Sequence, residues 1–275
     1  MHVRGRLDHP RVPGACCRRR AERGRLRRGA ASGNLVVSAS TTRPGAPGQR
    51  LLRVVAIDGP AGAGKSTVAR FLADRLGLEY LDTGAMYRAV TFGALERRVP
   101  VDAEEAVARL ARDLTLELDE RGVRVDGVDA TAAIRSPEVT ALVSTVAANP
   151  AVRHELRRRQ RAWGEERRGG VIEGRDIGSV VFPDAVLKVY LTASPRVRAL
   201  RRVAEAGGDV DEIERAIAER DRLDSTRVDS PLVEADGSVV VDTSDRGIDD
   251  VVDELVTLVR RRERQLASLG EGGPQ

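Results

Sequence analysis

One stretch of ten residues constrains the fold of this chain more than any other. It reads Asp58-Gly59-Pro60-Ala61-Gly62-Ala63-Gly64-Lys65-Ser66-Thr67 and directly follows an apolar run at residues 51–57. A buried strand that leads into a glycine-rich turn and then a helix aims several backbone N–H groups at one point. The glycines adopt torsions that a side chain would forbid, so a ligand can approach the backbone closely. The stretch therefore predicts an anion-binding loop in an α/β fold.

The spacing G-x-x-x-x-G-K-S in this stretch is that of the Walker A motif, or P-loop. Lys65 can reach the β- and γ-phosphates of a nucleotide, and the Ser66 hydroxyl can ligate Mg²⁺. Lysine is rare in this chain, which has only Lys65 and Lys188, so a chance match to the motif is not expected. The residues predicted to bind the nucleotide are Gly59, Pro60, Ala61, Gly62, Ala63, Gly64, Lys65, Ser66 and Thr67.

Charge is distributed unevenly along the chain. Residues 1–50 hold twelve arginines against Asp8 and Glu22. Their net charge of about +10 leaves about −6 for the remainder, although the whole chain carries +4. The body of the protein is thus mildly acidic, and we expect no nucleic-acid partner for it. Its length of 275 residues, of which 41% are hydrophobic, suffices for one large or two small domains with a sizeable core.

The cysteines and the hydropathy pattern indicate where the protein works. Cys16 and Cys17 are adjacent and both lie in the basic segment, so the body has no thiol for a disulfide, a metal cluster or a nucleophile. No apolar run approaches the 18 residues of a membrane span, and the N-terminus lacks a secretory signal. We therefore expect a cytoplasmic protein that has no membrane partner.

The first 50 residues are rich in Arg, Gly, Ala and Pro and show no apolar periodicity. Such a segment cannot bury enough surface to offset the entropy of ordering, so we expect residues 1–50 to be a disordered tail. A targeting peptide, an RNA-binding arm and an upstream start codon, with Val36 or Val37 as the real start, are three further explanations that stay open.

Hydrophobic periodicity predicts alternating strands and helices around the P-loop. A helix after the loop carries Val68, Phe71, Leu72 and Leu76 on its core side and ends before Gly77. A twofold pattern near 116–125 predicts an antiparallel hairpin, with a third strand near 128–132. The closing amphipathic helix is expected over 248–265. The fold class is therefore α/β, with a parallel sheet flanked by helices and a small antiparallel sheet in an insert.

These patterns give the expected domain boundaries. The core with the P-loop takes residues 51–84 and 164–265 and includes a short helical lid at about 198–212, the insert with the small antiparallel sheet takes 85–163, and residues 266–275 form a second disordered tail.

Arginines gather near the predicted strand ends. They are Arg88, Arg153, Arg175, Arg198, Arg201, Arg202, Arg220, Arg222 and Arg227. Phosphoryl transfer between two phosphate esters brings many negative charges together, and arginine supplies a fixed cationic fork for them. The chain has no Asn-Lys-x-Asp guanine motif and no long apolar strand that ends in the Asp of a motor ATPase. A small-molecule kinase is therefore favoured over a GTPase or a motor.

Four stretches resemble the bacterial cytidylate kinases, a branch of the nucleoside monophosphate kinases. They are Ile57 to Ser66, Leu81-Asp82-Thr83-Gly84-Ala85-Met86-Tyr87-Arg88, Glu173-Gly174-Arg175-Asp176-Ile177-Gly178, and Ala218 to Arg227. The resemblance covers about residues 53–263 and leaves the tail outside.

The resemblance implies transfer of the ATP γ-phosphoryl group to CMP or dCMP. It implies that Arg88 and Arg175 hold the acceptor phosphate, with Thr83 nearby. It further implies that Ser144, Arg153 and Asp176 read cytosine and that Arg220, Asp224 and Arg227 hold the sugar and phosphate. Of these transfers, the one to Ser144 has the least sequence support, because only its spacing to Asn149-Pro150 and Arg153 carries it.

The expected chemistry needs no general base, because the acceptor oxygen is already anionic. Lys65, Mg²⁺ on Ser66, and the lid arginines Arg201 and Arg202 would instead stabilise the transferred group. We expect a monomer. Two alternatives stay open: a kinase for another small acceptor such as UMP, and a nucleotide-dependent regulatory protein whose basic arm binds RNA.

Overall fold

The computed structural model describes residues 52–119 and 122–270. The tails expected at 1–50 and at 271–275 lie outside the described residues. The strands are β1 (Arg53–Asp58), β2 (Tyr80–Asp82), β3 (Leu116–Asp119), β4 (Gly122–Val125), β5 (Val128–Asp129), β6 (Gly169–Gly174), β7 (Leu187–Thr192) and β8 (Val239–Asp242). The helices are α1 (Lys65–Leu76), α2 (Thr83–Glu96), α3 (Glu104–Asp113), α4 (Pro137–Ala148), α5 (Pro150–Glu166), α6 (Pro195–Ala206), α7 (Val210–Thr226) and α8 (Ile248–Gly270), with short turns η1 (Ala133–Arg135) and η2 (Ile177–Val181).

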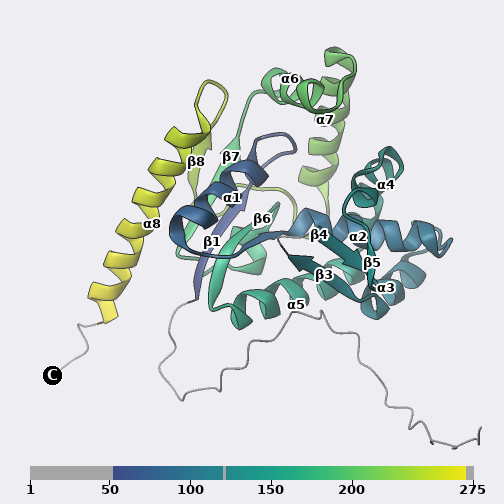
Figure 1. Ribbon diagram of the computed structural model, residues 1–275, viewed down its shortest axis with the longest axis horizontal. Coiled ribbons are helices and arrows are strands. Elements are labelled where there is room, and N and C mark those ends of the chain that lie inside the picture. Colours follow the sequence, from purple (N-terminus) through teal and green to yellow (C-terminus); the bar gives the residue numbers. More distant parts are fainter. Residues whose placement is uncertain (1–51, 120–121, 271–275) are drawn as a thin grey trace, which may run out of the picture. The chain divides into compact units, whose positions relative to one another are not determined.

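A five-stranded parallel sheet forms the centre of the described chain (Figure 1), with the order β2-β6-β1-β7-β8. Alternate residues of β1 point to opposite faces of this sheet. Val55 and Ile57 join the apolar cluster of α1 and α8, whereas Val54 and Ala56 join that of α2 and α5. The predicted α/β class with a parallel sheet between helices is confirmed.

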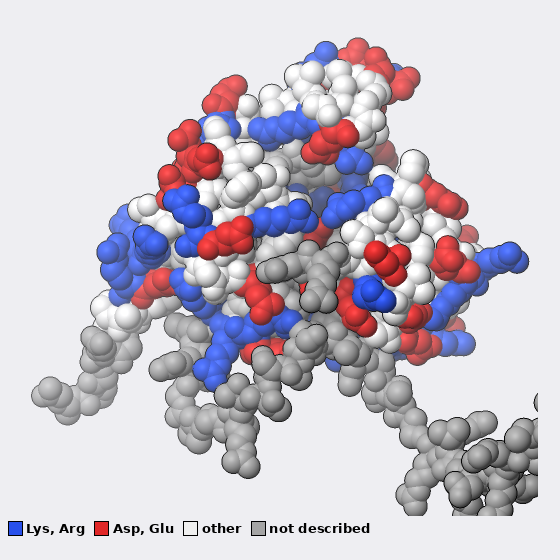
Figure 2. Space-filling view, viewed as in Figure 1, with Lys and Arg blue, Asp and Glu red and all other residues white. Residues whose placement is uncertain are grey.

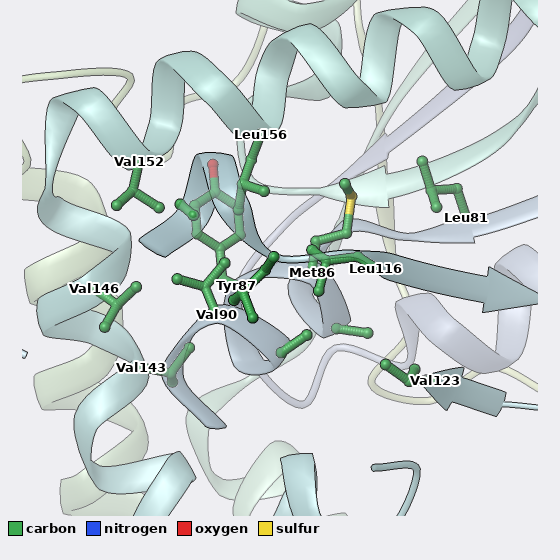
Figure 3. Packing of buried hydrophobic residues seen from close by; sticks show 14 of the residues in the cluster. Leu81, Met86, Tyr87, Val90, Leu116, Val123, Val143, Val146, Val152 and Leu156 are labelled. Atoms are coloured by element: carbon green, nitrogen blue, oxygen red, sulfur yellow. The ribbon is translucent and has the colours of Figure 1, made fainter. Parts of the chain in front are cut away.

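The insert between β2 and β6 carries its own antiparallel sheet, β3-β4-β5, as the twofold pattern predicted. Its apolar side chains pack with those of α2, α4 and α5 in one cluster (Figure 3). Tyr87 and Val90 from α2 lie in this cluster with Val143 from α4 and Leu156 from α5. The insert thus shares a core with one face of the main sheet.

The structure differs from two expectations. Phe71 is 49% exposed, whereas Val68, Leu72 and Leu76 are buried, because the buried stripe of α1 follows the i, i+4, i+8 positions and Phe71 lies beside it. The closing helix α8 continues to Gly270 and does not end at Gln265, so residues 266–270 are helical and not part of a disordered tail. Leu266, Ala267 and Ser268 include no helix breaker, and glycine first occurs at 270.

None of the helices within the described ranges is long and apolar enough to cross a membrane.

The fully buried Arg159 of α5 closes the end of α3. Its guanidinium donates to the carbonyl oxygens of Ala111 (2.8 Å), Arg112 (3.1 Å) and Leu114 (2.9 Å). It also pairs with Glu155 at 2.6 Å. The last carbonyls of a helix have no partner within the helix, so this one side chain satisfies three groups that would otherwise be buried unpaired.

Asp58, the last residue of β1, ties the P-loop strand to the segment after β6. Its Oδ1 accepts from the Ile177 N–H at 2.8 Å and its Oδ2 from the Gly178 N–H at 2.7 Å. Asp58 is only 3% exposed. The pKa of this carboxyl is raised to about 6. Burial is the largest cause and the nearby Asp176 adds to it, while the two N–H bonds and Lys65 oppose the rise.

We predict that Arg159→Met lowers the free energy of unfolding by about 3–5 kcal/mol, because it leaves carbonyls at the end of α3 without their donor and removes the buried one of the two cations that pair with Glu155. Urea unfolding followed by the fluorescence of Trp163, the chain's one tryptophan, measures the loss. Arg158→Met is the matched control, since Arg158 pairs with the same Glu155 but is 54% exposed. The control should lose less than about 1 kcal/mol. Equal losses in the two variants would show that the carbonyl bonds do not matter.

A second prediction concerns pH. The folded protein binds a proton at Asp58 more tightly than the unfolded chain, whose carboxyl keeps the ordinary pKa of 3.8. The stability gained by protonation is therefore fully present below about pH 4 and is lost as pH rises through about 6. We expect the thermal midpoint of the wild type minus that of Asp58→Asn to decrease as the pH rises from 4.5 to 7.5. A difference that grows over this range would show that the N–H bonds outweigh burial.

Candidate functional site

The P-loop joins β1 to α1 in the strand, loop and helix order that its spacing predicts. Gly59 has a φ of 146°, and a Cβ there would lie 2.0 Å from the Leu191 carbonyl oxygen. Gly64 precedes α1 in the left-handed region, with a φ of 86°. Both positions therefore require glycine. The loop leaves the N-terminus of α1 open to the cleft, which favours an anion.

Lys65 lies within this loop and is almost fully buried. Its Nζ donates to the Pro60 carbonyl oxygen at 2.7 Å. Burial lowers the pKa of Lys65, and the cations Arg175 and Arg220 lower it further, while Glu173 opposes them. An anionic ligand beside the ammonium would remove this penalty, so the lysine is poised to bind one.

A cleft of about 2030 Å³ opens in front of the P-loop. Its walls come from the P-loop and α1, from α2 and α4, from the end of β6, from α6 and α7, and from the segment after β8. Figure 2 shows the hollow beneath the α6 and α7 helices, with blue side chains along its edges. The carboxyl ends of the parallel strands meet at this cleft, where α/β sheets bind their ligands.

Most of the residues predicted from the sequence line this cleft. They are Ala61, Gly62, Ala63, Gly64, Lys65, Ser66, Thr67, Arg88, Ser144, Arg175, Arg201, Arg202, Arg220, Asp224 and Arg227. Segments far apart in the chain, from residue 61 to residue 227, are thus brought to one cavity. Chemically, the arrangement pairs a phosphate-binding loop with a group of cations on the facing walls.

Five predicted residues do not line it: Gly59, Pro60, Thr83, Arg153 and Asp176. The Thr83 hydroxyl donates to the Glu173 carbonyl oxygen at 2.6 Å. Arg153 and Asp176 are buried and pair with each other at 2.6 Å. Arg153 also lies over the Tyr87 ring, 5.6 Å from its centroid. These groups therefore lie behind the cleft wall.

Asp224 of α7 pairs with cations on one wall of the cleft. It pairs with Arg175 at 2.9 Å and with Arg227 at 3.5 Å. Burial raises the pKa of Asp224, but Arg175, Arg227 and Arg220 outweigh it and hold the pKa below its ordinary value. The carboxylate therefore stays charged and neutralises part of the excess positive charge.

Arg220 differs from its neighbours because it has no hydrogen-bond or ion-pair partner among the described residues, and its Nε is buried and unsatisfied. The pKa of Arg220 is lowered to about 10, chiefly by burial and next by repulsion from Arg175, while Asp224 opposes the fall. A partly buried cation without a partner is costly, so the site favours an anionic ligand.

The other predicted cations, Arg88, Arg201 and Arg202, have partners among the described residues. Arg88 donates to the Ile134 carbonyl oxygen (3.2 Å) and to Thr140 Oγ1 (2.9 Å), which ties α2 to η1 and α4. Arg201 donates to the Thr243 carbonyl oxygen at 2.6 Å and to its Oγ1 at 3.0 Å. Arg202 is half exposed and lies 3.4 Å from Glu205.

Two carboxylates at the site, Glu173 and Asp82, were not predicted. Glu173 is the last residue but one of β6, beside the P-loop strand, and it accepts a hydrogen bond from Tyr80 and lies near Ser66. Burial raises the pKa of Glu173, as does the neighbouring Asp82, while Lys65 and the hydroxyls oppose the rise. The signal that could have indicated Glu173 is an acidic residue near the carboxyl end of a short strand that lies next to β1. The sequence does not show which strand lies next to β1, and only the pairing of β1 with β6 does so.

No group of three or more His, Cys, Asp and Glu side chains is placed to hold a metal ion anywhere in the parts of the chain that the structure describes. Ser66 and Asp82 are oxygen-bearing side chains near Glu173 at the P-loop end of the cleft.

Comparison with known proteins adds the family. A family model described as cytidylate kinase matches residues 55–261. Bifunctional pantoate ligase/cytidylate kinases of Synechococcus sp. (strain CC9311) and Prochlorococcus marinus (strain MIT 9303) are 52% and 49% identical over 221 and 219 residues. The matches cover 76% and 75% of this chain but only 44% of each relative, so the chain spans less than half their length.

Solved structures resemble it more weakly. A gluconokinase from Sinorhizobium meliloti 1021 aligns at 17% identity with a TM-score of 0.39, covering 80% of this chain and 99% of that one. A shikimate kinase from Acinetobacter baumannii gives the same identity and TM-score over 76% and 94%. Likenesses at this level identify no function. The family match, by contrast, covers the P-loop, the insert, α6 and α7. The chain therefore belongs to the cytidylate kinase family.

Proposed function

We propose that this protein transfers the γ-phosphoryl group of ATP to CMP or dCMP, which yields ADP and CDP or dCDP. The observation that carries the proposal is the cleft in which a P-loop faces the cations Arg88, Arg175, Arg220 and Arg227. One anion site holds a donor and the other an acceptor, as direct transfer between two phosphate esters requires. Membership of the cytidylate kinase family names the acceptor.

The donor side fits a nucleotide with Mg²⁺. The Ser66 hydroxyl, the Glu173 carboxylate and Asp82 supply the oxygen donors that Mg²⁺ prefers, and the small number of protein ligands suits an ion that keeps several waters. Bound there, Mg²⁺ would neutralise phosphate charge during transfer. The ammonium of Lys65 and the backbone N–H groups of the P-loop would hold the β- and γ-phosphates.

On the acceptor side, Arg88 and Arg175 would hold the phosphate, with Thr83 close by. Arg220, Asp224 and Arg227 would hold the sugar and phosphate. Arg175 and Arg227 are paired with Asp224, so an incoming phosphate would interact with cations that Asp224 neutralises only in part. The phosphate would also give the unpaired Arg220 an anionic partner. The acceptor oxygen is anionic already, so the site needs orientation and positive charge but no general base.

Cytosine recognition falls to Ser144, Arg153 and Asp176. Asp176 would accept from the 4-amino group, while Arg153 would donate to N3. The 2.6 Å ion pair between Arg153 and Asp176 supports this assignment, because it places the guanidinium and the carboxylate side by side behind the cleft wall. Reaching the base requires these two side chains to turn toward the cleft, where Ser144 already lies.

The larger parts of the chain take roles accordingly. We assign acceptor binding to the insert at 85–163, the donor site to the core at 51–84 and 164–265, and a lid to 198–212, which includes the break between α6 and α7. Arg201 and Arg202 would bring positive charge to the transferred group from this lid. Every group invoked lies in one chain, which supports a monomer. We assign the protein to the cytoplasm, with small nucleotides and no nucleic acid as its partners.

The proposal predicts a specific acceptor preference. With MgATP, the purified protein should form ADP in the presence of CMP or dCMP at a kcat/KM at least about tenfold above that for UMP. Uracil carries O4 and N3–H where cytosine carries an amino group and N3, so Asp176 and Arg153 would face mismatched groups. Asp176→Asn should reduce the CMP over UMP ratio, since an amide can also donate to O4. ADP formation that no nucleoside monophosphate accelerates would rule out the activity, and an unchanged ratio in the variant would rule out the role of Asp176.

For the unpaired Arg220 we predict that its removal weakens CMP binding without lowering thermal stability. Arg220→Met should weaken CMP binding by about tenfold or more, because it removes a cation from the acceptor site. The same change should leave the thermal midpoint equal or higher, because it removes a buried charge that repels Arg175. Titration calorimetry and thermal unfolding measure the two effects. Arg222→Met on the same helix is the control, since Arg222 is exposed and pairs with Glu219, and it should change neither quantity. A lower midpoint for Arg220→Met would mean that the guanidinium is a structural element.

A further inference from the structure

One ion pair binds both backbone polar groups of the P-loop residue Ala61. Arg198 of α6 and Asp221 of α7 form this pair, with Nη1 and Oδ2 2.5 Å apart. The same Nη1 donates to the Ala61 carbonyl oxygen at 3.0 Å, and Asp221 Oδ1 accepts from the Ala61 N–H at 3.4 Å. We call this arrangement of Arg198, Asp221 and the Ala61 backbone the clamp.

Arg198 is held in a fixed orientation. Its side chain is 6% exposed, and its Nε donates to the Ala193 carbonyl oxygen at 3.0 Å, just after β7. The loop packs directly on it, since a Cβ on Gly62 would lie 3.1 Å from the Arg198 Cβ. A guanidinium with three bonds in one plane has little freedom to move, so the position of Ala61 is set from outside the loop.

The anion-binding shape of a P-loop depends on the torsions of its backbone, because these aim the N–H groups. The loop's glycines leave those torsions free, so something else must select one set. We infer that the clamp is this selector: Arg198 and Asp221 are positioning residues that hold the P-loop ready for the donor's phosphates and fasten it to the α6 and α7 helices. The inference rests on the proposed function in taking a nucleotide as the donor.

A second ion pair between the same helices separates this role from helix packing. Arg196 of α6 pairs with Asp211 and, at 3.2 Å, with Glu214 of α7. The helices lie side by side (Figure 1), and both ion pairs join them. Only the Arg198–Asp221 pair also touches the P-loop among the contacts of the described residues. Arg196→Met therefore breaks an α6–α7 link and leaves the clamp intact.

The test measures binding of MgADP and of CMP separately by titration calorimetry on the full-length chain. Arg198→Met and Asp221→Asn should each raise the Kd for MgADP by about tenfold or more, while the Kd for CMP stays within about twofold of wild type. Arg198→Lys should not restore MgADP binding, because an ammonium cannot make the three bonds in one plane. Arg196→Met should keep both affinities within about twofold.

An unchanged MgADP affinity in folded Arg198→Met and Asp221→Asn would overturn the inference. So would parallel losses of MgADP and CMP affinity, which would indicate general damage, or an equal loss in Arg196→Met, which would assign the effect to helix packing. If Arg198→Met does not fold, Asp221→Asn, which nearly keeps the side-chain shape, decides alone. A wild type that binds MgADP but does not phosphorylate CMP would refute the proposed function and leave the clamp testable, so the two failures are distinct.

Discussion

Repulsion among buried and partly buried cations is the constraint on which the site depends. Burial lowers the pKa of Lys65 and of Arg220, and Arg175 lowers both further, while Arg220 also lowers the pKa of Lys65. Glu173 and Asp224 lie among them and stay near enough to offset part of the repulsion. The offset is incomplete, since Arg220 keeps no partner among the described residues. Phosphate groups would relieve this uncompensated positive charge, which converts the cost of burial into affinity for anions.

The same charges connect the parts of the molecule. Arg175 comes from the end of β6 and meets Asp224 on α7, while Arg153 of α5 meets Asp176 after β6. Arg135 of the insert lies 3.4 Å from Asp82 at the end of β2. These contacts join the core to the insert and β6 to α7, and Arg153, Arg175, Asp176 and Asp224 are among the groups proposed to bind the acceptor. A ligand that competes for them would change the links between the parts as it binds, whereas the apolar clusters would keep each part intact.

Much of the fold was predictable because its signals are local. The P-loop needs only glycine spacing and a preceding strand, and the insert's sheet follows from a twofold pattern over 116–125. Phe71 was assigned wrongly because one helix turn of apolar residues does not fix the edge of the buried stripe. The predicted end of α8 at Gln265 was too early. Residues 266–269 lack strong apolar periodicity, so the pattern that predicted the helix stops there, but they carry no stop signal and the helix continues.

The site was less accessible to sequence reasoning for a physical reason. Glu173 became relevant only once β6 paired with β1, a contact across more than a hundred residues. Arg153 and Asp176 were expected at the ligand, but burial and their mutual attraction hold them behind the wall of the ligand-free cleft. Side-chain pairing between distant segments is not encoded in any local pattern, so spacing could name these residues without giving their geometry.

Arginine itself limits what composition can reveal in this chain, where all but two of the 46 basic residues are arginines. Arg159 closes α3 through three carbonyls, Arg198 holds Ala61, and Arg201 holds Thr243. A guanidinium can bond several backbone oxygens in one plane and a lysine cannot, so many of these side chains serve as structural connectors. What separates a connector from a ligand-binding cation is therefore the partner. Arg159 and Arg198 each bond a carboxylate as well as backbone carbonyls. Arg175 and Arg227 share one carboxylate and bond one carbonyl each, and Arg220 has no partner among the described residues. The incompletely neutralised group of Arg175, Arg220 and Arg227 faces the cleft.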